Sequence, residues 1–326
     1  MTKSDIGSAT NVYREFQPQF LHHRAIILSI IRSFVAVTLC LQAGCFPVDS
    51  IPVKEAKSPK RFVDWCLNQA KLPSQTRHTV DVLLEIAGTQ DCARADNILS
   101  NFTRLDLYQN PIADLKPLSS LTKLTDLYLG NSQIADLKPL SSLTKLTDLD
   151  LSNSQIADIK PLSSLINLTD LYLESNQITD IKPLSSLTKL TDLDLGSNQI
   201  ADIKPLSSLT KLIYLFLYSN QIADIKPLSS LTNLTNLVLY GNQITDIKPL
   251  SSLTNLTDLN LDSNQIADIK PLSSLTNLTD LNLSYNQIAD IKPLSSLTNL
   301  TILFLPSNQM LANKSCPVKP ESICKF

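Results

Sequence analysis

Acidic side chains recur at a fixed spacing through this 326-residue chain and are its first candidates for chemistry. Six aspartates directly precede a Leu-x-Leu triplet, and two more stand between the leucines of such a triplet. The first set is Asp126, Asp148, Asp170, Asp192, Asp258 and Asp280, and the second is Asp150 and Asp194. If neighbouring triplets pair as strands, these carboxylates form columns about 5 Å apart that could attract a cation or a basic partner. A solvated polar surface is the alternative interpretation.

Aromatic side chains interrupt this polar pattern in one zone. Tyr214, Phe216 and Tyr218 alternate along one predicted strand, Val238 and Tyr240 belong to the next, and Tyr172 and Glu174 lie two repeats earlier. All should point outward and form a contiguous patch bordered by Asp192 and Asp194. Exposed aromatic residues ringed by polar groups are typical of protein-binding sites, and tyrosines also stack on sugars. We predict that these residues bind the ligand, and chance variation among exposed positions is the alternative.

Composition argues against catalysis, metal binding and nucleic-acid binding. The chain has six glycines, no glycine-rich phosphate loop, no His-Glu-x-x-His motif and no Cys-x-x-Cys motif. Its three histidines lie outside the repeats. Residues 101–309 contain 20 acidic and 14 basic side chains, a net charge of −6, which disfavours a nucleic-acid partner. We expect no cofactor, no metal and no enzymatic activity.

A 22-residue repeat must position these residues. Its register is marked by Leu105, Leu127, Leu149, Leu171, Leu193, Leu215, Leu237, Leu259, Leu281 and Leu303. The Leu-x-Leu alternation predicts a short strand with both leucines facing inward. In the Lys-Pro-Leu-Ser-Ser segment, proline can begin a short helical turn, which should form the convex side. One turn cannot bury its own apolar side chains, so about ten stacked turns should form a solenoid over residues 102–309.

Asparagine follows most of the predicted strands at a fixed position. The residues are Asn110, Asn176, Asn198, Asn220, Asn242, Asn264, Asn286 and Asn308. A buried amide can bridge the backbones of successive turns, so these residues predict an asparagine ladder. The second and third repeats differ, because Ser132 and Ser154 occupy the ladder position and Asn131 and Asn153 precede them. We expect weaker bridging there, by about 1 kcal/mol for each lost hydrogen bond.

The repeat resembles that of a known family. The pattern Asn-Gln-Ile-x-Asp-Ile-x-Pro-Leu-x-x-Leu-Thr-x-Leu, as in residues 198–212, is similar to the repeat of bacterial internalin-like leucine-rich repeat proteins and covers about 200 residues. The resemblance implies an α/β solenoid, a right-handed superhelix whose concave face carries a parallel β-sheet. It also implies an exported protein that binds protein partners on that face.

Four cysteines flank the repeats, where a solenoid needs caps over its apolar ends. The helical spacing from Thr76 to Ala87, ended by Gly88, predicts a helix within an N-terminal cap over residues 61–101. A short C-terminal cap should cover residues 310–326. We predict the disulfides Cys66–Cys92 and Cys316–Cys324, which suit an oxidising compartment. Reduced cysteines in the core are the alternative.

The first 44 residues are predicted to be an N-terminal extension and signal peptide. The run from Ser33 to Gly44 is apolar, follows Arg24 and Arg32, and ends in small residues, as export signals do. A single membrane anchor is an alternative, although it would place Arg32 in or beside the apolar span.

Cys45 ends a segment, Leu41 to Cys45, that resembles a lipoprotein cleavage box. This resemblance implies a lipid on Cys45 and anchorage to a membrane, and an ordinary cleaved signal is the alternative. Residues 45–60 are rich in proline and lysine, which predicts a flexible tether.

These features favour an exported recognition or adhesion module that is secreted, periplasmic or anchored at the cell surface. We expect a monomer that binds a protein ligand, or a glycan, on its concave face. The alternative is a cytosolic regulatory scaffold that binds a protein such as a phosphatase, because cytosolic phosphatase-regulating repeat proteins share the 22-residue period.

Overall fold

The computed structural model describes residues 61–308 and 315–326. All the described residues belong to the unit Ser58–Phe326. The predicted signal peptide, tether and lipidation site at Cys45 therefore lie outside the described residues. Within the described ranges, no helix is both long enough and apolar enough to cross a membrane.

Three short helices lie between residue 61 and the repeats. They are α1 (Phe62–Leu67), α2 (Ser74–Ala87) and α3 (Cys92–Leu99), with a 3₁₀ turn, η2 (Gln69–Lys71), between the first two. Helix α2 ends at Gly88, whose φ of 64° is left-handed, as the sequence predicts for a helix stop. Its buried face includes Val80, Leu83 and Leu84, which join the same core as the first repeat.

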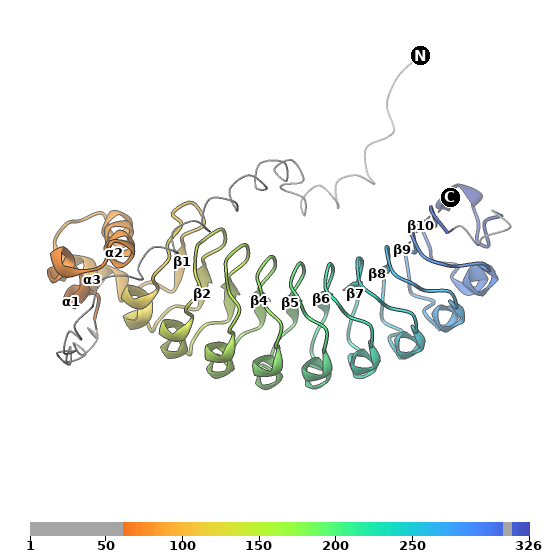
Figure 1. The fold of residues 1–326 in the computed structure, drawn as a ribbon, viewed down its shortest axis with the longest axis horizontal. Coiled ribbons are helices and arrows are strands. Elements are labelled where there is room, and N and C mark those ends of the chain that lie inside the picture. Colours follow the sequence, from red (N-terminus) through yellow and green to blue (C-terminus); the bar gives the residue numbers. More distant parts are fainter. Residues whose placement is uncertain (1–60, 309–314) are drawn as a thin grey trace, which may run out of the picture. The chain divides into compact units, whose positions relative to one another are not determined.

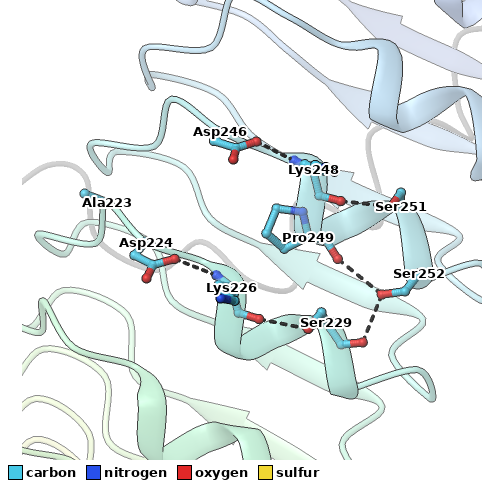
Figure 2. A pocket seen from close by; sticks show the side chains of 9 residues that line it. All are labelled: Ala223, Asp224, Lys226, Ser229, Asp246, Lys248, Pro249, Ser251 and Ser252. Atoms are coloured by element: carbon cyan, nitrogen blue, oxygen red, sulfur yellow. Dashed lines mark hydrogen bonds between the residues drawn. The ribbon is translucent and has the colours of Figure 1, made fainter.

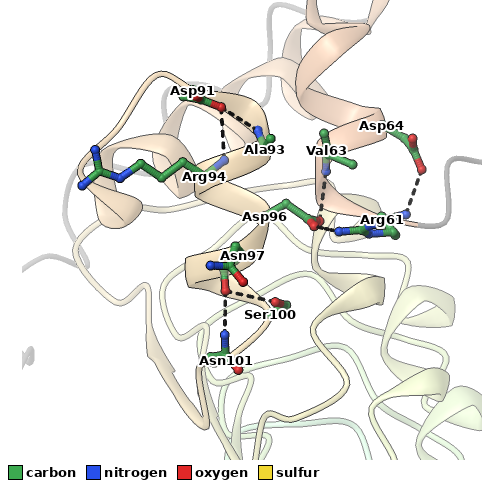
Figure 3. A network of polar contacts seen from close by, with 10 residues as sticks. All are labelled: Arg61, Val63, Asp64, Asp91, Ala93, Arg94, Asp96, Asn97, Ser100 and Asn101. Atoms are coloured by element: carbon green, nitrogen blue, oxygen red, sulfur yellow. Dashed lines mark hydrogen bonds and ion pairs between the residues drawn. The ribbon is translucent and has the colours of Figure 1, made fainter.

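Polar contacts and a disulfide join these helices into the N-terminal cap. Cys66 of α1 bonds to Cys92 of α3, with Cα atoms 5.6 Å apart. The buried Asp96 carboxylate of α3 forms an ion pair with Arg61 and accepts a hydrogen bond from the Val63 amide at 3.2 Å (Figure 3). Because a buried carboxylate needs such partners, this contact fixes the start of α1 on α3.

The repeats form one parallel sheet, which contains eleven strands in sequence order within the described residues. The strands are β1 (Arg104–Asp106), β2 (Asp126–Tyr128), β3 (Asp148–Asp150), β4 (Asp170–Tyr172), β5 (Asp192–Asp194), β6 (Tyr214–Phe216), β7 (Asn236–Val238), β8 (Asp258–Asn260), β9 (Asp280–Asn282), β10 (Ile302–Phe304) and β11 (Cys324–Lys325). The central leucine of each strand pairs with the next in register from Leu105 to Leu303. This confirms the predicted solenoid, in which the sheet follows the inner curve (Figure 1).

A 3₁₀ helix forms the outer side of each of the first nine repeats. These helices are η3 (Lys116–Ser120), η4 (Lys138–Ser142), η5 (Lys160–Ser164), η6 (Lys182–Ser186), η7 (Lys204–Ser208), η8 (Lys226–Ser230), η9 (Lys248–Ser252), η10 (Lys270–Ser274) and η11 (Lys292–Ser296), and η12 (Glu321–Ile323) lies in the C-terminal cap. Proline stands in the first turn of the repeat helices, where its missing N–H is not needed. An aspartate before each helix accepts a hydrogen bond from the lysine amide, as Asp202 does from Lys204 at 2.8 Å.

A groove of about 620 Å³ lies on this outer side between η8 and η9 (Figure 2). It is lined by Asp224, Lys226, Asp246 and Lys248, among others. Both aspartates are bonded to the amides of their own helices, and Ser252 Oγ donates to the Ser229 carbonyl at 2.9 Å. Its polar groups thus serve the repeat fold, and the same arrangement recurs along the stack.

The asparagines of the ladder connect successive turns. Asn198 Nδ2 donates to the carbonyls of Leu173, Leu195 and Gly196 at 3.0–3.1 Å, and its Oδ1 accepts from the Ile178 amide at 3.0 Å. Equivalent bonds link the turns from Asn176 to Asn308. Asn110 departs from the prediction: no ladder bond from its half-buried side chain is present in the described residues, because the first turn has no repeat before it.

The C-terminal cap closes the other end of the described sheet. Cys316 and Cys324 form a disulfide, and Cys324 pairs with Leu303 as β11 extends the sheet beyond β10. Val318 and Ile323 are buried against the last repeat. The short disulfide-closed cap predicted from the sequence is therefore present.

Candidate binding face of the sheet

The outward residues of the sheet form three rows, because each strand presents the residues on both sides of its central leucine and a further residue follows the strand. At β4 to β7, the first row is Asp170, Asp192, Tyr214 and Asn236, and the second is Tyr172, Asp194, Phe216 and Val238. The third contains Glu174, Gly196, Tyr218 and Tyr240. The nine predicted patch residues all lie in these rows, and we call them the concave patch. Each is half-buried or exposed.

Tyr218 lies next to other residues of the third row. It lies beyond the end of β6, since that strand ends at Phe216. Its ring stacks on Tyr240 with centroids 4.8 Å apart and an interplanar angle of 12°. Burial raises the pKa of Tyr218, and the nearby carboxylates of Asp194 and of Glu174, two turns away, add to the shift.

Gly196 makes this position of the Tyr218 ring possible. A Cβ at Gly196 would lie 2.3 Å from the Tyr218 ring, so any side chain there would displace the ring. The sequence contains this signal as a glycine in a row of larger residues, but the prediction did not use it. The result is a pre-arranged row across four turns, in which the two tyrosines stack on each other and the Tyr218 ring lies over Gly196, toward Glu174.

Asp194 lies inside the patch, which corrects the prediction that it borders it. In the strand register it stands between Tyr172 and Phe216. Burial raises the pKa of Asp194 to about 7, although a hydrogen bond from the Gly196 amide at 2.8 Å opposes the shift. Asp192 occupies the neighbouring row, and burial raises its pKa too. Sequence spacing places both aspartates on the face but does not reveal that the Tyr218 ring lies over Gly196 and close to Asp194, an arrangement we call the aromatic cover.

Tyr214 is the most exposed aromatic side chain of the patch, with 39% of its surface accessible. It follows Asp192 in the first row and ends the run of aspartates that begins on β2. Asp258 and Asp280 lie on β8 and β9, beyond Asn236 and away from the aromatic zone. The structure therefore separates the predicted acidic column into two parts.

Several aspartates in this face are held by their neighbours. Thr125 Oγ1 donates to Asp126 and Thr169 Oγ1 to Asp170, each at 2.5 Å, and the same pairing recurs at Asp258 and Asp280. Within the described residues, no group of three or more metal-binding side chains is arranged to hold a metal ion. The outward chemistry of this face is that of carboxylates and aromatic rings.

Known proteins share this architecture. The family model described as leucine-rich repeats in two copies matches residues 101–142, 127–164, 144–186, 166–208, 188–230, 210–252, 232–274 and 276–314. The chain belongs to the leucine-rich repeat family. No protein with a curated description matches this sequence significantly.

Solved structures show which branch of the leucine-rich repeat family this chain resembles. An internalin (inlF) of Listeria monocytogenes is 32% identical with a TM-score of 0.60, over 72% of this chain and 79% of that one. Internalin C2 (inlC2) of the same organism is 34% identical with a TM-score of 0.53, over 70% and 92% of the two chains. The predicted internalin-like repeat is thus confirmed.

A plant peptide hormone receptor, RGFR1, solved in complex with RGF2, is also similar. It is 26% identical with a TM-score of 0.57, over 65% of this leucine-rich repeat chain and 37% of the receptor. The repeat family therefore includes solenoids that bind polypeptide ligands.

Proposed function

We propose that this leucine-rich repeat protein is an exported recognition module that binds a protein ligand through the concave patch. The observation that carries the proposal is the pre-arranged aromatic row. Tyr218 and Tyr240 are stacked on each other beside Glu174, so little freedom of the two rings remains to be lost on binding. Aromatic anchors of this kind dominate many protein interfaces.

The neighbouring strands extend this surface. On β6, Tyr214 pairs with Asp192 of β5 and Phe216 pairs with Asp194. Phe216 also pairs with Val238 of β7. The patch therefore combines apolar contact area with carboxylates that can orient a partner. Tyrosines on the same face would also suit a glycan. The binding test below distinguishes a glycan ligand from a protein ligand.

Export is supported by the two disulfides and by the internalin likeness. Cys66–Cys92 and Cys316–Cys324 lie in the two caps, and such bonds persist in oxidising compartments. Internalin-like proteins, to which the repeats are similar, act outside the cytosol. The signal-like segment before residue 45, the tether over 45–60 and a lipid on Cys45 remain parts of this proposal.

The patch is tested by replacing Tyr214, Phe216 and Tyr218 with alanine in the full chain. Surface proteins captured by the unaltered protein should be lost, because the replaced rings form the centre of the patch. Far-ultraviolet circular dichroism should be unchanged. The matched control is Tyr285→Asn, since Tyr285 is 60% exposed and has a φ of 51° that asparagine tolerates. Capture that survives the triple replacement would place the site elsewhere, and capture of glycans alone would exclude a protein ligand.

Export is tested by the mass of the protein from its native cell, measured with and without reductant. A shortened amino terminus and two disulfides are expected. An intact amino terminus with free thiols would instead support the cytosolic scaffold.

A further inference from the structure

Basic side chains are nearly absent from the outward face of the sheet. At the three outward rows of β1 to β10, Arg104 is the sole lysine or arginine. Its guanidinium lies over the Tyr128 ring, 4.8 Å from the ring centroid. The Tyr128 hydroxyl in turn donates a hydrogen bond to Asp148. The first turns therefore contain a complete group of arginine, tyrosine and aspartate.

Tyr172 occupies the position of Tyr128 two repeats later. The register places Asp150 and Asp194 on either side of Tyr172, as it places Asp106 and Asp150 on either side of Tyr128. In the first row, Asp170 and Asp192 correspond to Asp126 and Asp148.

The surroundings of Tyr128 and Tyr172 differ at one position. The residue that corresponds to Arg104 is Asp148, 44 residues further along the sequence. The second tyrosine is therefore surrounded by carboxylates and has no arginine of its own.

Three further observations concern the carboxylates around Tyr172. Asp148 Oδ1 is shielded from solvent and has no hydrogen-bond partner. Tyr172 makes no hydrogen bond with Asp192 among the described residues, although Tyr128 bonds the equivalent Asp148. Burial and the nearby Asp170 raise the pKa of Asp192, as expected where carboxylates face one another without a counter-ion.

We propose that the protein partner places an arginine over Tyr172, between the first-row aspartates of β3 to β5, as Arg104 lies over Tyr128. This inference rests on the proposed function and names the chemistry of its ligand. Arginine fits better than lysine, because its planar guanidinium stacks on a ring while its N–H groups remain directed at carboxylates. The adjoining rings of the concave patch would then contact the apolar part of the same partner.

The test uses the full chain and a fluorescent hexa-arginine peptide, with binding followed by anisotropy at about 0.15 M salt, where distant charges are screened. Tyr172→Leu and the double replacement Asp170→Asn with Asp192→Asn should each weaken binding at least about tenfold. The matched control is Asp258→Asn with Asp280→Asn. This pair also stands on adjacent strands and accepts threonine hydrogen bonds, but it has asparagines in the second row. It should change binding less than about twofold.

A second pair of variants distinguishes binding at a site of defined geometry from general attraction between opposite charges. Asp148→Arg supplies the residue that Arg104 supplies at Tyr128, so it should fill the site and abolish peptide binding. Asp280→Arg makes the same charge change on β9 and should reduce binding far less. A hexa-lysine peptide should bind more weakly than hexa-arginine.

Equal losses in both pairs, equal binding of the two peptides, or no binding would overturn the proposal. Failure here is distinct from failure of the proposed function. If capture of a protein partner is lost in the Tyr214, Phe216 and Tyr218 variant but survives in the Tyr172 and Asp170/Asp192 variants, the patch binds a partner by another chemistry.

Discussion

Turns two and three differ from the later turns of the solenoid in the order of two residues. In turn three, Asn153 takes the left-handed position with φ of 53° and Ser154 the ladder position. In turn five, Ser197 takes the left-handed position with φ of 52°, and Asn198 the ladder position. Asparagine tolerates left-handed backbone better than serine, so the early turns have the less strained bend.

The later turns gain hydrogen bonds in exchange. Asn198 makes four ladder bonds, whereas Ser154 Oγ is buried with no hydrogen-bond partner. Ser132 Oγ accepts a single long contact, from the Ile112 amide at 3.4 Å. At about 1 kcal/mol for each bond, the ladder outweighs a strain of about 1 kcal/mol in the bend. The same backbone therefore accommodates either order of asparagine and serine, but only the order with asparagine in the ladder position gives the full set of hydrogen bonds between turns.

Removing a ladder amide should have the largest effect. Asn220→Ala leaves the Ile200 amide without its partner and removes one of the two asparagine hydrogen bonds to each of the Leu195 and Leu217 carbonyls, so it should lower the free energy of unfolding by about 3 kcal/mol. Ser154→Ala should change it by less than about 0.5 kcal/mol, because no bond is lost. Urea unfolding of both variants measures the difference. Equal effects would show that the ladder does not distinguish the two regions.

The aromatic cover of turn five should make stability depend on pH. The folded pKa of Asp194 is about 7, above its ordinary value, so the folded chain holds a proton that the unfolded chain releases between about pH 4 and 7. The free energy of unfolding should therefore fall as pH rises through this window. Asp148, Asp192 and Asp280 have raised pKa values and contribute in the same direction.

Asp194→Asn should remove part of this pH dependence and stabilise the protein at pH 8 by at least about 1 kcal/mol. The matched control in turn three is Asp150→Asn. Asp150 accepts a hydrogen bond from the Ser152 amide at 2.8 Å, as Asp194 does from Gly196, but the ring near it, beside Gly130, is that of the exposed Tyr108 and not that of Tyr218. Thermal unfolding at pH 5 and pH 8 compares the two, and identical profiles would contradict the role assigned to the aromatic cover.

Adding a ladder amide should have a smaller effect of opposite sign. Asn153→Ser combined with Ser154→Asn gives turn three the order of turn five, so it should stabilise the protein by about 1 kcal/mol, the gain in bonds less the strain of the bend. The single change Ser154→Asn avoids that strain and should stabilise at least as much. A loss of stability in both would mean that the early turns are spaced differently from the later ones.

Relieving the bend should have the smallest effect. Ser197→Gly removes the cost of a left-handed serine and should stabilise by about 0.5 kcal/mol, because the unfolded chain also gains freedom from glycine. Asn153→Gly should be close to neutral, since asparagine already suits that conformation. Gly241, with φ of 68°, shows that the chain uses glycine at this position once. Differential scanning calorimetry can resolve the shift.

The sequence determined the repeat, the strands, the outer helical turns and the ladder, because each is a local pattern that recurs every 22 residues. Identical turns stack in one register, so the burial of Leu193 or the exposure of Tyr214 follows from its place in the repeat. The helix before Gly88 was equally local. The positions of the patch residues on one face could be predicted for this reason.

Only the tertiary structure decided what those residues do to one another. The Tyr218 ring lies over Gly196 and toward Glu174, Asp194 lies under aromatic cover, and Arg104 lies over Tyr128 while Tyr172 has no such partner. These contacts join residues from 22 to 44 positions apart and depend on how side chains lean along the stack. A repeat pattern gives the row of a residue, whereas rotamer, ring orientation and the absence of a Cβ determine its contacts.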